Sequence, residues 1–532
     1  MLIKANCDNV TLAVEKALSR GEKEIVFEKG EYHFYQENAQ ERNSYISNHD
    51  NDGVKRVGIN LENLSGITID GAGSKFIFHG IMLPISVTNS TDVVLRNFSI
   101  DFPVAAYVHS TVLEAGEDFC DVKLWENTPY RMENGTPFFA VDGGYEFPYG
   151  NALEFNPKLE CVEYGTNERD YFTHSNAEEL SIGVLRIKQD FPVTPKEGNY
   201  MFFRLGKRFA PAIFIDKSLE ITVKEVTVHH CFGMALLAQL SGNINIHAVK
   251  VIPSSGRFVS AYADAVHFVE CRGDIVVENC HFEKQMDDAL NCHGIYVRVE
   301  EVCGKTALLH LMHRQALGIP VFSAGDNVEY VDFETMQSYG ENRIVKAQMQ
   351  DASTIRVTFE KEASVKCGDY LENISHSPNL TVRNCYFGKN RARGLLITTR
   401  GKVLVENNTF ERTGTAIRIS GDCNFWFESG VVKDVTISGN TFIDLNANSR
   451  WGQAVIDVTP QNVKAYRAVH KNIRIINNTF RTFDEPLLWA KSAEGIVFKN
   501  NEIEKTTTFP PKGLLADAVT LIGCHDCNIE NK

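Results

Sequence analysis

Three aspartates in the middle of the chain, Asp264, Asp287 and Asp288, have the residue type and spacing that point most directly to chemistry. Residues 263–267 (Ala-Asp-Ala-Val-His) are similar to residues 287–291 (Asp-Asp-Ala-Leu-Asn), which begin 24 residues later. If the chain stacks short strands, an offset of this size brings a residue to the same position on the next layer. Carboxylates held close together acquire different pKa values, because each charge disfavours ionisation of its neighbour. The pattern therefore predicts a site for general acid and base catalysis.

The alignment of the two segments assigns a role to each carboxylate. Asp264 and Asp288 are at equivalent positions, so we expect them to hold and polarise one water molecule as the base. Asp287 comes one residue earlier, and successive strand side chains diverge, so we expect it to reach a different atom as the acid. We expect burial beside two anions to raise its pKa and keep it protonated. An acid separated from a water-holding base is the arrangement of an inverting glycosidase. A solvated turn is the alternative, and the apolar neighbours Met286 and Leu290 argue against it.

Polar side chains after the aspartates and on later repeats are candidates for binding sugar hydroxyl groups: His267, Asn291, His293, Arg393 and Arg418. A second interpretation makes His267 a buried core residue with its hydrogen bonds satisfied. Trp451 and Trp489 either stack on a sugar face or pack in the core, and the packing role is favoured.

One short segment type recurs along the chain and indicates a repeat architecture. It has a β-branched run, then one or two Asn or Cys residues, then an aromatic or aliphatic residue, at 277–282, 382–387, 405–410, 437–442, 475–480 and 497–503. Phe387 and Phe410 are 23 residues apart, as are Phe480 and Ile503. A period of this length with alternating strand patterns and almost no helical pattern predicts an all-β, right-handed parallel β-helix. Asn suits the left-handed bends of such a coil and can hydrogen-bond along a stack.

A second column of the repeat carries Asp264, Asp288, Arg393 and Thr415 in succession, each followed by a small residue. Since the first position is polar each time, we expect this column to face outward as a charged groove along the solenoid.

The ends and interruptions of the repeat predict the domain organisation. Asp8 or Asn9 can cap a short helix that ends at Gly21 and covers the open first layer. Two stretches that lack the repeat are predicted to be inserted antiparallel β modules that resemble small barrels. The second module can form a wall of the carboxylate groove. The predicted order is cap and first coils (1–101), first module (102–216), catalytic coils (217–294), second module (295–372) and last coils (373–532). The last coil has no visible cap, so either a second copy of the chain covers it, forming a homo-oligomer, or this edge is short and polar.

Composition excludes several classes of partner. The chain has 532 residues and a formal net charge of -14, which disfavours nucleic acid and fits a neutral substrate. No stretch approaches twenty apolar residues, and no signal peptide is visible, so we expect no membrane association and a cytoplasmic location. The 13 cysteines are scattered and are expected to be reduced core residues. The lone Cys-x-x-Cys at 524–527 is interpreted as structural rather than as a metal or redox site.

The residues around the aspartates resemble the signature of a known family. Asp-Ala-Val-His-Phe at 264–268 and Asp-Asp-Ala-Leu-Asn-Cys-His-Gly at 287–294 are similar to the motif of glycoside hydrolase family 110. The resemblance implies exo-acting α-1,3-galactosidase activity on a parallel β-helix with inserted β-barrel modules. It implies removal of terminal α-1,3-linked galactose, as on blood group B or linear Gal-α-1,3-Gal glycans, with inversion and without a metal or other cofactor. The family's carboxylate triad maps onto Asp264, Asp287 and Asp288.

Three other functions fit parts of the pattern. A polygalacturonase has a related aspartate arrangement, but its Gly-His-Gly and Arg-Ile-Lys elements should follow the Asp pair. Here Cys-His-Gly follows at 292–294, and the one Arg-Ile-Lys lies upstream at 186–188. A calcium-dependent pectate lyase needs a base beside an acidic metal cluster, a role open to Arg393. A non-catalytic β-helix adhesin or glycan-binding protein would not need three aspartates on adjacent layers.

Overall fold

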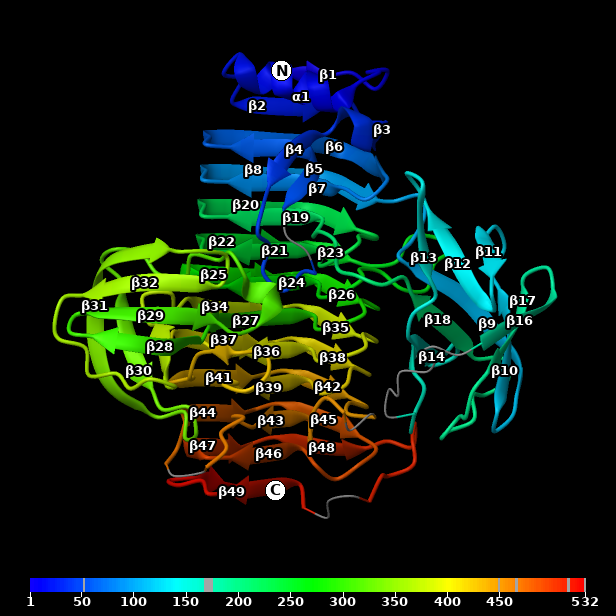
Figure 1. Cartoon of the computed structure of the whole chain (residues 1–532). Helices are drawn as coiled ribbons and strands as arrows, with labels where there is room; N and C mark the ends of the chain where they lie inside the picture. Colours follow the sequence, from blue (N-terminus) through cyan, green and yellow to red (C-terminus); the bar gives the residue numbers. More distant parts are fainter. Residues whose placement is uncertain (51–52, 167–175, 448–449, 465–466, 514–516, 531–532) are drawn as a thin grey trace.

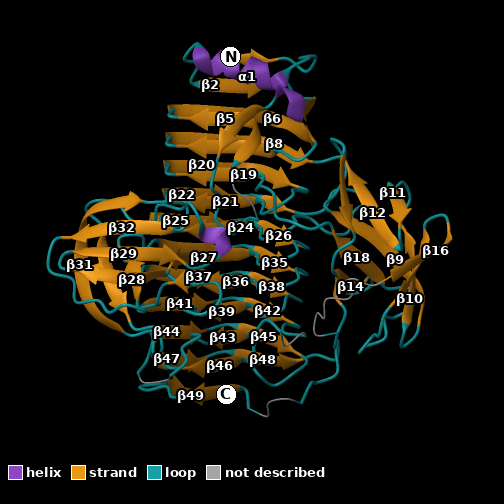
Figure 2. Ribbon diagram, in the orientation of Figure 1, coloured by secondary structure: helices purple, strands orange, loops and turns teal. Residues whose placement is uncertain are grey.

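The structure of the chain, a computed structural model, describes residues 1–50, 53–166, 176–447, 450–464, 467–513 and 517–530. Its strands stack in parallel layers along one axis, with the two ends of the chain at opposite ends of the stack (Figure 1). Strands dominate the ribbon, and a helix lies over the first layer (Figure 2). The prediction of an all-β parallel β-helix is confirmed.

Two walls of the β-helix belong to one long parallel sheet, because long strands in the first coils run through both walls and the later, shorter strands lie in one wall or the other. Its strands are β1 Leu2–Ile3, β2 Glu24–Phe27, β3 Glu31–Tyr35, β6 Ser65–His79, β8 Thr91–Asp101, β20 Leu219–Val228, β22 Gly242–His247, β23 Lys250–Val251, β25 Arg272–Glu278, β26 His281–Glu283, β34 Asn379–Arg383, β35 Tyr386–Gly388, β37 Lys402–Glu406, β38 Thr409–Glu411, β41 Asp434–Ser438, β42 Thr441–Ile443, β44 His470–Ile476, β45 Thr479–Thr482, β47 Ala493–Lys499, β48 Glu502–Lys505 and β50 Asn528–Ile529.

A second parallel sheet carries the aspartates. Its strands are β5 Val54–Glu62, β7 Leu83–Thr88, β19 Ile213–Asp216, β21 Leu236–Gln239, β24 Val266–Val269, β27 Leu290–Ile295, β36 Leu395–Ile397, β39 Ile417–Ile419, β43 Ile456–Val458, β46 Leu488–Lys491 and β49 Val519–Ile522. Two short strands, β4 Gln40–Asn43 and β40 Glu428–Ser429, join β5 and β27 in antiparallel pairing.

The register of the second sheet places the first three polar residues of the predicted column on successive coils. Val266 pairs with Leu290, and Leu290 pairs with Leu395. The backbone N–H of Ala265 donates to the carbonyl of Asp288 at 3.0 Å. Asp264, Asp288 and Arg393 therefore occupy the same position on three successive coils.

Stacked side chains hold the coils together. Phe387, Phe410, Phe442 and Phe480 form one file, with successive ring centroids 5.1, 5.2 and 4.8 Å apart. In a second file the side-chain amides of Asn408, Asn440 and Asn478 each donate to the Oδ1 of the next Asn, Asn501 being the last, at 3.0 Å. The second file confirms the predicted hydrogen bonding of Asn along the stack, and it supplies the partners that buried amides need.

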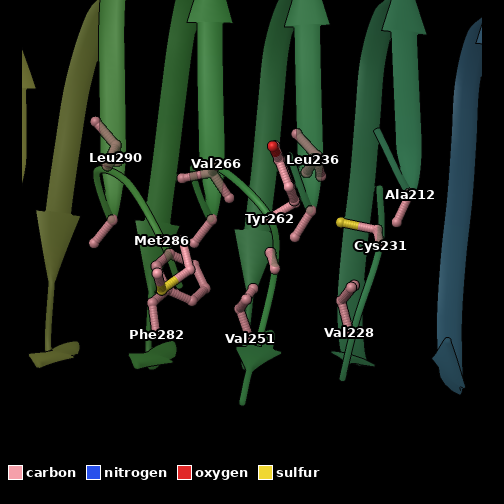
Figure 3. Close-up of a cluster of buried hydrophobic side chains, with 14 of the residues drawn as sticks. Ala212, Val228, Cys231, Leu236, Val251, Tyr262, Val266, Phe282, Met286 and Leu290 are labelled. Atoms are coloured by element: carbon pink, nitrogen blue, oxygen red, sulfur yellow. The ribbon is translucent and has the colours of Figure 1, made fainter. Parts of the chain in front are cut away.

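The interior of the catalytic coils is a continuous apolar core. Figure 3 shows Val228, Val251 and Phe282 in one row, and Leu236, Val266 and Leu290 in another, along successive coils. The three aspartates come just before the buried ends of β24 and β27, so packing of these rows fixes where the carboxylates stand. Of the 13 cysteines, all are free and most are buried, as predicted.

The helix α1 (Val10–Ser19) closes the N-terminal end of the stack (Figure 2). Asn9 caps it by accepting a hydrogen bond from the backbone N–H of Leu12 at 2.9 Å. Gly21 follows the helix with a φ of 76°, a conformation that suits glycine. β49 and β50 form the opposite end (Figure 1), and its coverage by a second copy stays a prediction.

Two antiparallel modules project from the β-helix on opposite sides in Figure 1. The first has a seven-stranded sheet of β9 Tyr107–Ala115, β10 Phe119–Leu124, β14 Ala152–Asn156, β15 Cys161–Val162, β16 Asn176–Ser181, β17 Val184–Lys188 and β18 Tyr200–Arg204, and a three-stranded sheet of β11 Tyr130–Glu133, β12 Thr136–Val141 and β13 Tyr145–Pro148. The second is a closed barrel of β28 Val297–Cys303, β29 Thr306–Leu311, β30 Asn327–Val331, β31 Ser338–Met349, β32 Thr354–Phe359 and β33 Tyr370–Asn373. Two 3₁₀ turns, η1 Gln36–Asn38 and η2 Arg314–Ala316, are the remaining elements among the residues that the structure describes.

One predicted boundary is wrong. β19 pairs in parallel with β7 and β21, so residues 213–216 already belong to the β-helix and not to the first module. The apolar residues of β19 had no Asn-aromatic segment beside them, which is why the sequence pattern placed them in the insertion. Among the described residues no helix is long and apolar enough to span a membrane.

Candidate active site

A cavity of about 490 Å³ opens over the polar column of the second sheet. Several separate parts of the chain line it: the loop after β4 (Asn48), the end of β18 and the segment after it (Arg204, Arg208), the turns before β24, β27 and β36 (Asp264, Asp287, Asp288, Arg391, Arg393), the strands themselves (His267, Asn291, Leu396, Arg418), the loop 420–428 and residues 450, 451 and 461. The predicted carboxylate cluster and the predicted groove thus belong to one cavity.

The three aspartates are almost completely buried at the wall of this cavity. Asp264, Asp287 and Asp288 are 3%, 8% and 1% exposed. Burial of ionised carboxylates is costly unless each gains a charged partner or a proton, and the three groups divide between these two solutions.

Asp287 takes the first solution and stays ionised. Its Oδ2 accepts a charge-assisted hydrogen bond from the guanidinium of Arg208. Burial acts to raise the pKa of Asp287, but Arg208, Arg391 and Arg393 outweigh it, and the pKa lies below the usual value. The prediction that Asp287 is kept protonated is therefore wrong, because arginines surround it, and Arg208 among them comes from outside the repeat.

Asp288 takes the second solution. Burial raises its pKa to about 7 against the opposing effect of Arg393, and the charge of Asp287 acts with burial. The Oδ1 of Asp288 accepts the backbone N–H of Arg393 at 2.9 Å and its Nε–H at 2.8 Å. Burial and the charge of Asp287 also raise the pKa of Asp264 well above its usual value. The charge order of the cluster is thus the reverse of the one expected from the column alignment.

A chain of hydrogen bonds runs from Asp264 to the next coil. Burial raises the pKa of Asp264 and lowers that of His267, so a protonated Asp264 donates from Oδ2 to Nδ1 of a neutral His267 ring at 2.7 Å. Nε2 of His267 then carries the hydrogen of that ring and donates to Nε2 of His293 at 2.9 Å. The carbonyl of Gly294 can only accept, so Nδ1 of His293 donates to it at 2.7 Å.

The residues predicted to bind substrate divide into two groups. His267, Asn291, Arg393 and Arg418 line the cavity, whereas His293 is not among its lining residues. Asn291 and His293 are on the same face of β27, but β40 pairs with the end of β27 where His293 lies and covers it. His293 is therefore corrected from a substrate-binding residue to the partner of His267.

Asn291 is the best placed of these groups to bind a ligand. Its Oδ1 is buried and has no hydrogen-bond partner among the described residues, while its Nδ2 lies 3.5 Å from Oε1 of Glu428. An unpartnered buried amide oxygen at a cavity wall is satisfied when a hydroxyl group enters. Arg418 lines the same wall and donates to the carbonyl of Trp451 at 3.0 Å.

Trp451 lines the cavity, and Trp489 does not. The ring of Trp451 lies below the guanidinium groups of Arg391 and Arg393, each 5.1 Å from the ring centroid. Trp451 therefore packs against charged wall residues by cation-π contacts.

Sequence reasoning missed Arg208 and Glu428. Arg208 lies in the segment that returns from the first module, and Glu428 lies on β40, where neither the repeat nor a motif marks it. Glu428 adds a fourth carboxylate close to the column, 3.6 Å from Nε2 of His293. Only the tertiary fold brings these two residues to the cavity.

Asp50 holds the segment that carries Arg208. Its Oδ2 accepts the backbone N–H of Arg208 at 3.0 Å, and its backbone N–H donates to the carbonyl of Arg208 at 2.9 Å. Its Oδ1 accepts from Arg314 at 2.7 Å and from Gln315 at 2.5 Å, both in η2 of the barrel module. The carboxylate of Asp50 thus connects the N-terminal loop to the barrel module and to Arg208, which pairs with Asp287.

A parallel β-helix with a cluster of three buried carboxylates at the wall of a cavity defines a class: the fold and the site are those of a β-helix glycoside hydrolase. Comparison with known proteins gives the family. Alpha-1,3-galactosidase A of Bacteroides fragilis is 34% identical over 542 residues, covering 99% of this chain and 89% of its own. Alpha-1,3-galactosidase B of the same species is 36% identical, covering 96% of this chain and 91% of its own. The chain belongs to glycoside hydrolase family 110, the family of these alpha-1,3-galactosidases.

Both inserted modules match family models. The description GLAA-B beta-barrel domain I matches residues 109–201, and GLAA-B beta-barrel domain II matches residues 306–371. Among solved structures, polygalacturonase from Erwinia carotovora ssp. carotovora is similar with a TM-score of 0.45 and 11% identity, covering 98% of this chain and 95% of that chain.

Proposed function

We propose that this chain removes terminal α-1,3-linked galactose from the non-reducing end of glycans, with inversion at the anomeric carbon. One observation carries the proposal: three carboxylates of adjacent coils, at most 8% exposed, line one cavity, and arginines bind two of them, Arg208 at Asp287 and Arg393 at Asp288. Relatives in the family that carry the name alpha-1,3-galactosidase support the choice of sugar and linkage.

The charge states support one assignment of roles. Asp288, with a pKa of about 7, donates its proton to the glycosidic oxygen as the bond to the anomeric carbon breaks. Ionised Asp287 accepts a proton from the water molecule whose oxygen attacks that carbon from the opposite face. The products are β-galactose and the free hydroxyl of the remaining glycan, and the two aspartates exchange protonation states.

The protonated Asp264 has a supporting role in this scheme. Its hydrogen bond to His267 at 2.7 Å keeps it neutral, so that it adds no third negative charge beside the reacting carbon. A neutral carboxyl group at this position can donate and accept hydrogen bonds to water and sugar hydroxyls.

The walls of the cavity support a sugar at one end of a chain. They come from the N-terminal loop, the segment that returns from the first module and the loop 420–428, and this arrangement favours an end-on pocket over a through groove.

Hydrolysis assays test the proposal directly. The purified chain is incubated with Gal-α-1,3-Gal, Gal-α-1,4-Gal, Gal-α-1,6-Glc and polygalacturonate, and released galactose or reducing ends are measured. We expect release from the α-1,3 disaccharide, with little from the other substrates, and loss of about 10³-fold or more in Asp288→Asn. The blood group B trisaccharide, assayed beside the linear disaccharide, ranks branched against linear substrates. Release from polygalacturonate, or full activity in Asp288→Asn, contradicts the proposal.

A further inference from the structure

The loop 420–428 places two exposed aromatic side chains at the cavity. Phe425 and Trp426 line it and are 64% and 42% exposed, in contrast to the buried aspartates. Their rings are 5.2 Å apart at 85° to one another. Exposed adjacent aromatic rings are costly in water, and a binding site is the usual reason that a protein keeps them.

The backbone under the two rings is fixed before any ligand binds. The carboxylate of Asp422, itself 7% exposed, accepts the backbone N–H groups of Asn424 at 2.7 Å, Phe425 at 3.0 Å and Trp426 at 2.5 Å. This local hydrogen bonding makes a rigid turn, so little conformational entropy is lost when a ligand contacts the rings.

The barrel module supports Trp426 from the other side. The ring of His313, between β29 and η2, lies 4.7 Å from the Trp426 ring and 6.5 Å from that of Phe425. The aromatic pair thus sits where the β-helix loop meets the second inserted module.

The aromatic pair is continuous with the catalytic wall. Two residues beyond Trp426, Glu428 pairs with Ile295 of β27 and approaches the side chain of Asn291. The cavity therefore changes from buried charged groups at the aspartates to exposed aromatic rings at this loop. A sugar offers both kinds of surface, since its hydroxyls are polar and its ring C–H faces are apolar.

From this gradient we propose that Phe425 and Trp426 form the subsite for the sugar that carries the terminal galactose. The inference rests on the proposed function. The terminal galactose occupies the buried polar end, where Asn291 and the arginines meet its hydroxyls. The penultimate sugar lies against the aromatic pair through an apolar face, and leaves from there after the bond is cut.

The test compares a substrate that has a penultimate sugar with one that lacks it. In Trp426→Ala, kcat/KM for Gal-α-1,3-Gal is expected to fall about tenfold or more, the size of one stacking contact. For α-galactosyl fluoride, whose leaving group is a single ion, kcat/KM is expected to stay within about threefold of wild type. Trp426→Phe keeps an aromatic face and is expected to recover most of the loss. Phe333→Ala, which removes an aromatic ring 44% exposed that is not among the cavity-lining residues, is the matched control and leaves both substrates unchanged.

Binding in an inactive background gives a second readout. In Asp288→Asn, calorimetric titration with the disaccharide is expected to show weaker binding when Trp426→Ala is added, whereas binding of free galactose is unchanged. Equal losses on the disaccharide and the fluoride, or an unchanged Kd for the disaccharide, overturn the inference while leaving the proposed function intact. A wild-type chain that cleaves the fluoride but not the disaccharide overturns both the proposed linkage and this subsite.

Discussion

The Oδ2 atom of Asp264 lies 2.7 Å from Nδ1 of His267, at one end of a chain of hydrogen bonds that links two coils. Because burial raises the pKa of Asp264 and lowers that of His267, Asp264 donates to His267. His267 then donates to His293, and His293 donates to the backbone carbonyl of Gly294. Two residues of β27 are thus linked to the protonation of a carboxylate on the preceding coil.

This chain predicts an effect of His293, which does not line the cavity. In His293→Gln the acceptor for His267 is altered, Asp264 is no longer held as a donor, and kcat is expected to fall about tenfold or more with KM little changed. Steady-state kinetics on the disaccharide measure kcat and KM separately. His281→Gln, on the opposite sheet, is the control. A rise in KM at constant kcat would show that His293 contacts the sugar after all.

The assigned roles of Asp288 and Asp287 predict different responses to the leaving group. Asp288→Asn is expected to lose most activity on the disaccharide but much less on 2,4-dinitrophenyl α-galactoside, which needs no proton donor. Asp287→Ala is expected to lose activity on both, and added azide should restore turnover by forming β-galactosyl azide. The reverse pattern, with Asp287 tolerant of good leaving groups and Asp288 rescued by azide, would restore the roles expected from the column alignment.

The pKa of Asp288 predicts the pH dependence of activity. Because the acid must be protonated, kcat/KM for the disaccharide is expected to fall as the pH rises through about 7. Asp287 has a lowered pKa, so it imposes no acidic limb above its usual value of 3.8. A pH profile on 2,4-dinitrophenyl α-galactoside should lack the fall near 7. An identical fall with both substrates would assign it to another group.

The raised pKa of Asp288 also makes the stability of the folded chain depend on pH. The folded chain holds a proton on Asp288 that the unfolded chain releases near pH 3.8. This contribution to stability is full below that pH and is lost as the pH rises through about 7. Urea unfolding of Asp288→Asn should therefore depend less on pH in this window than unfolding of the wild type.

Asp50 is predicted to act at a distance from the reacting atoms. Asp50→Ala frees the backbone of Arg208 and removes the hydrogen bonds to η2, so kcat/KM is expected to fall about ten- to hundredfold. Loss of these buried hydrogen bonds should also lower the free energy of unfolding by about 2 kcal/mol. Asp351→Ala removes an aspartate with similar local bonds in an exposed turn of the barrel module and should change neither value. Wild-type kinetics in Asp50→Ala would remove Asp50 from the positioning of Asp287.

Features set by local repeats were predictable from the sequence. The Asn and Phe files, the β-helix and the column of Asp264, Asp288 and Arg393 all follow from short segments recurring at a nearly constant offset. An Asn at each bend and an apolar residue at each alternate position determine where the chain turns and which face is buried.

Features set by segments outside the repeat were not predictable. The charge of Asp287 depends on Arg208, which comes from the end of the first module and is held by Asp50 in the N-terminal loop. Similarly, strand alternation alone puts His293 beside Asn291 in the cavity, and β40 covers it from more than a hundred residues away in the sequence. Because of such long-range contacts, the protonation states of Asp287 and Asp288 are the reverse of those predicted, although the aspartates lie where the repeat places them.

The stereochemistry of the first product tests the central claim most directly. Proton NMR spectra recorded within the first turnovers of Gal-α-1,3-Gal, before mutarotation, resolve the anomeric proton of the released galactose. Single displacement by Asp287 and Asp288 predicts β-galactose first, with the α anomer growing in later. Release of α-galactose as the first product would require a covalent intermediate and would contradict the proposed mechanism.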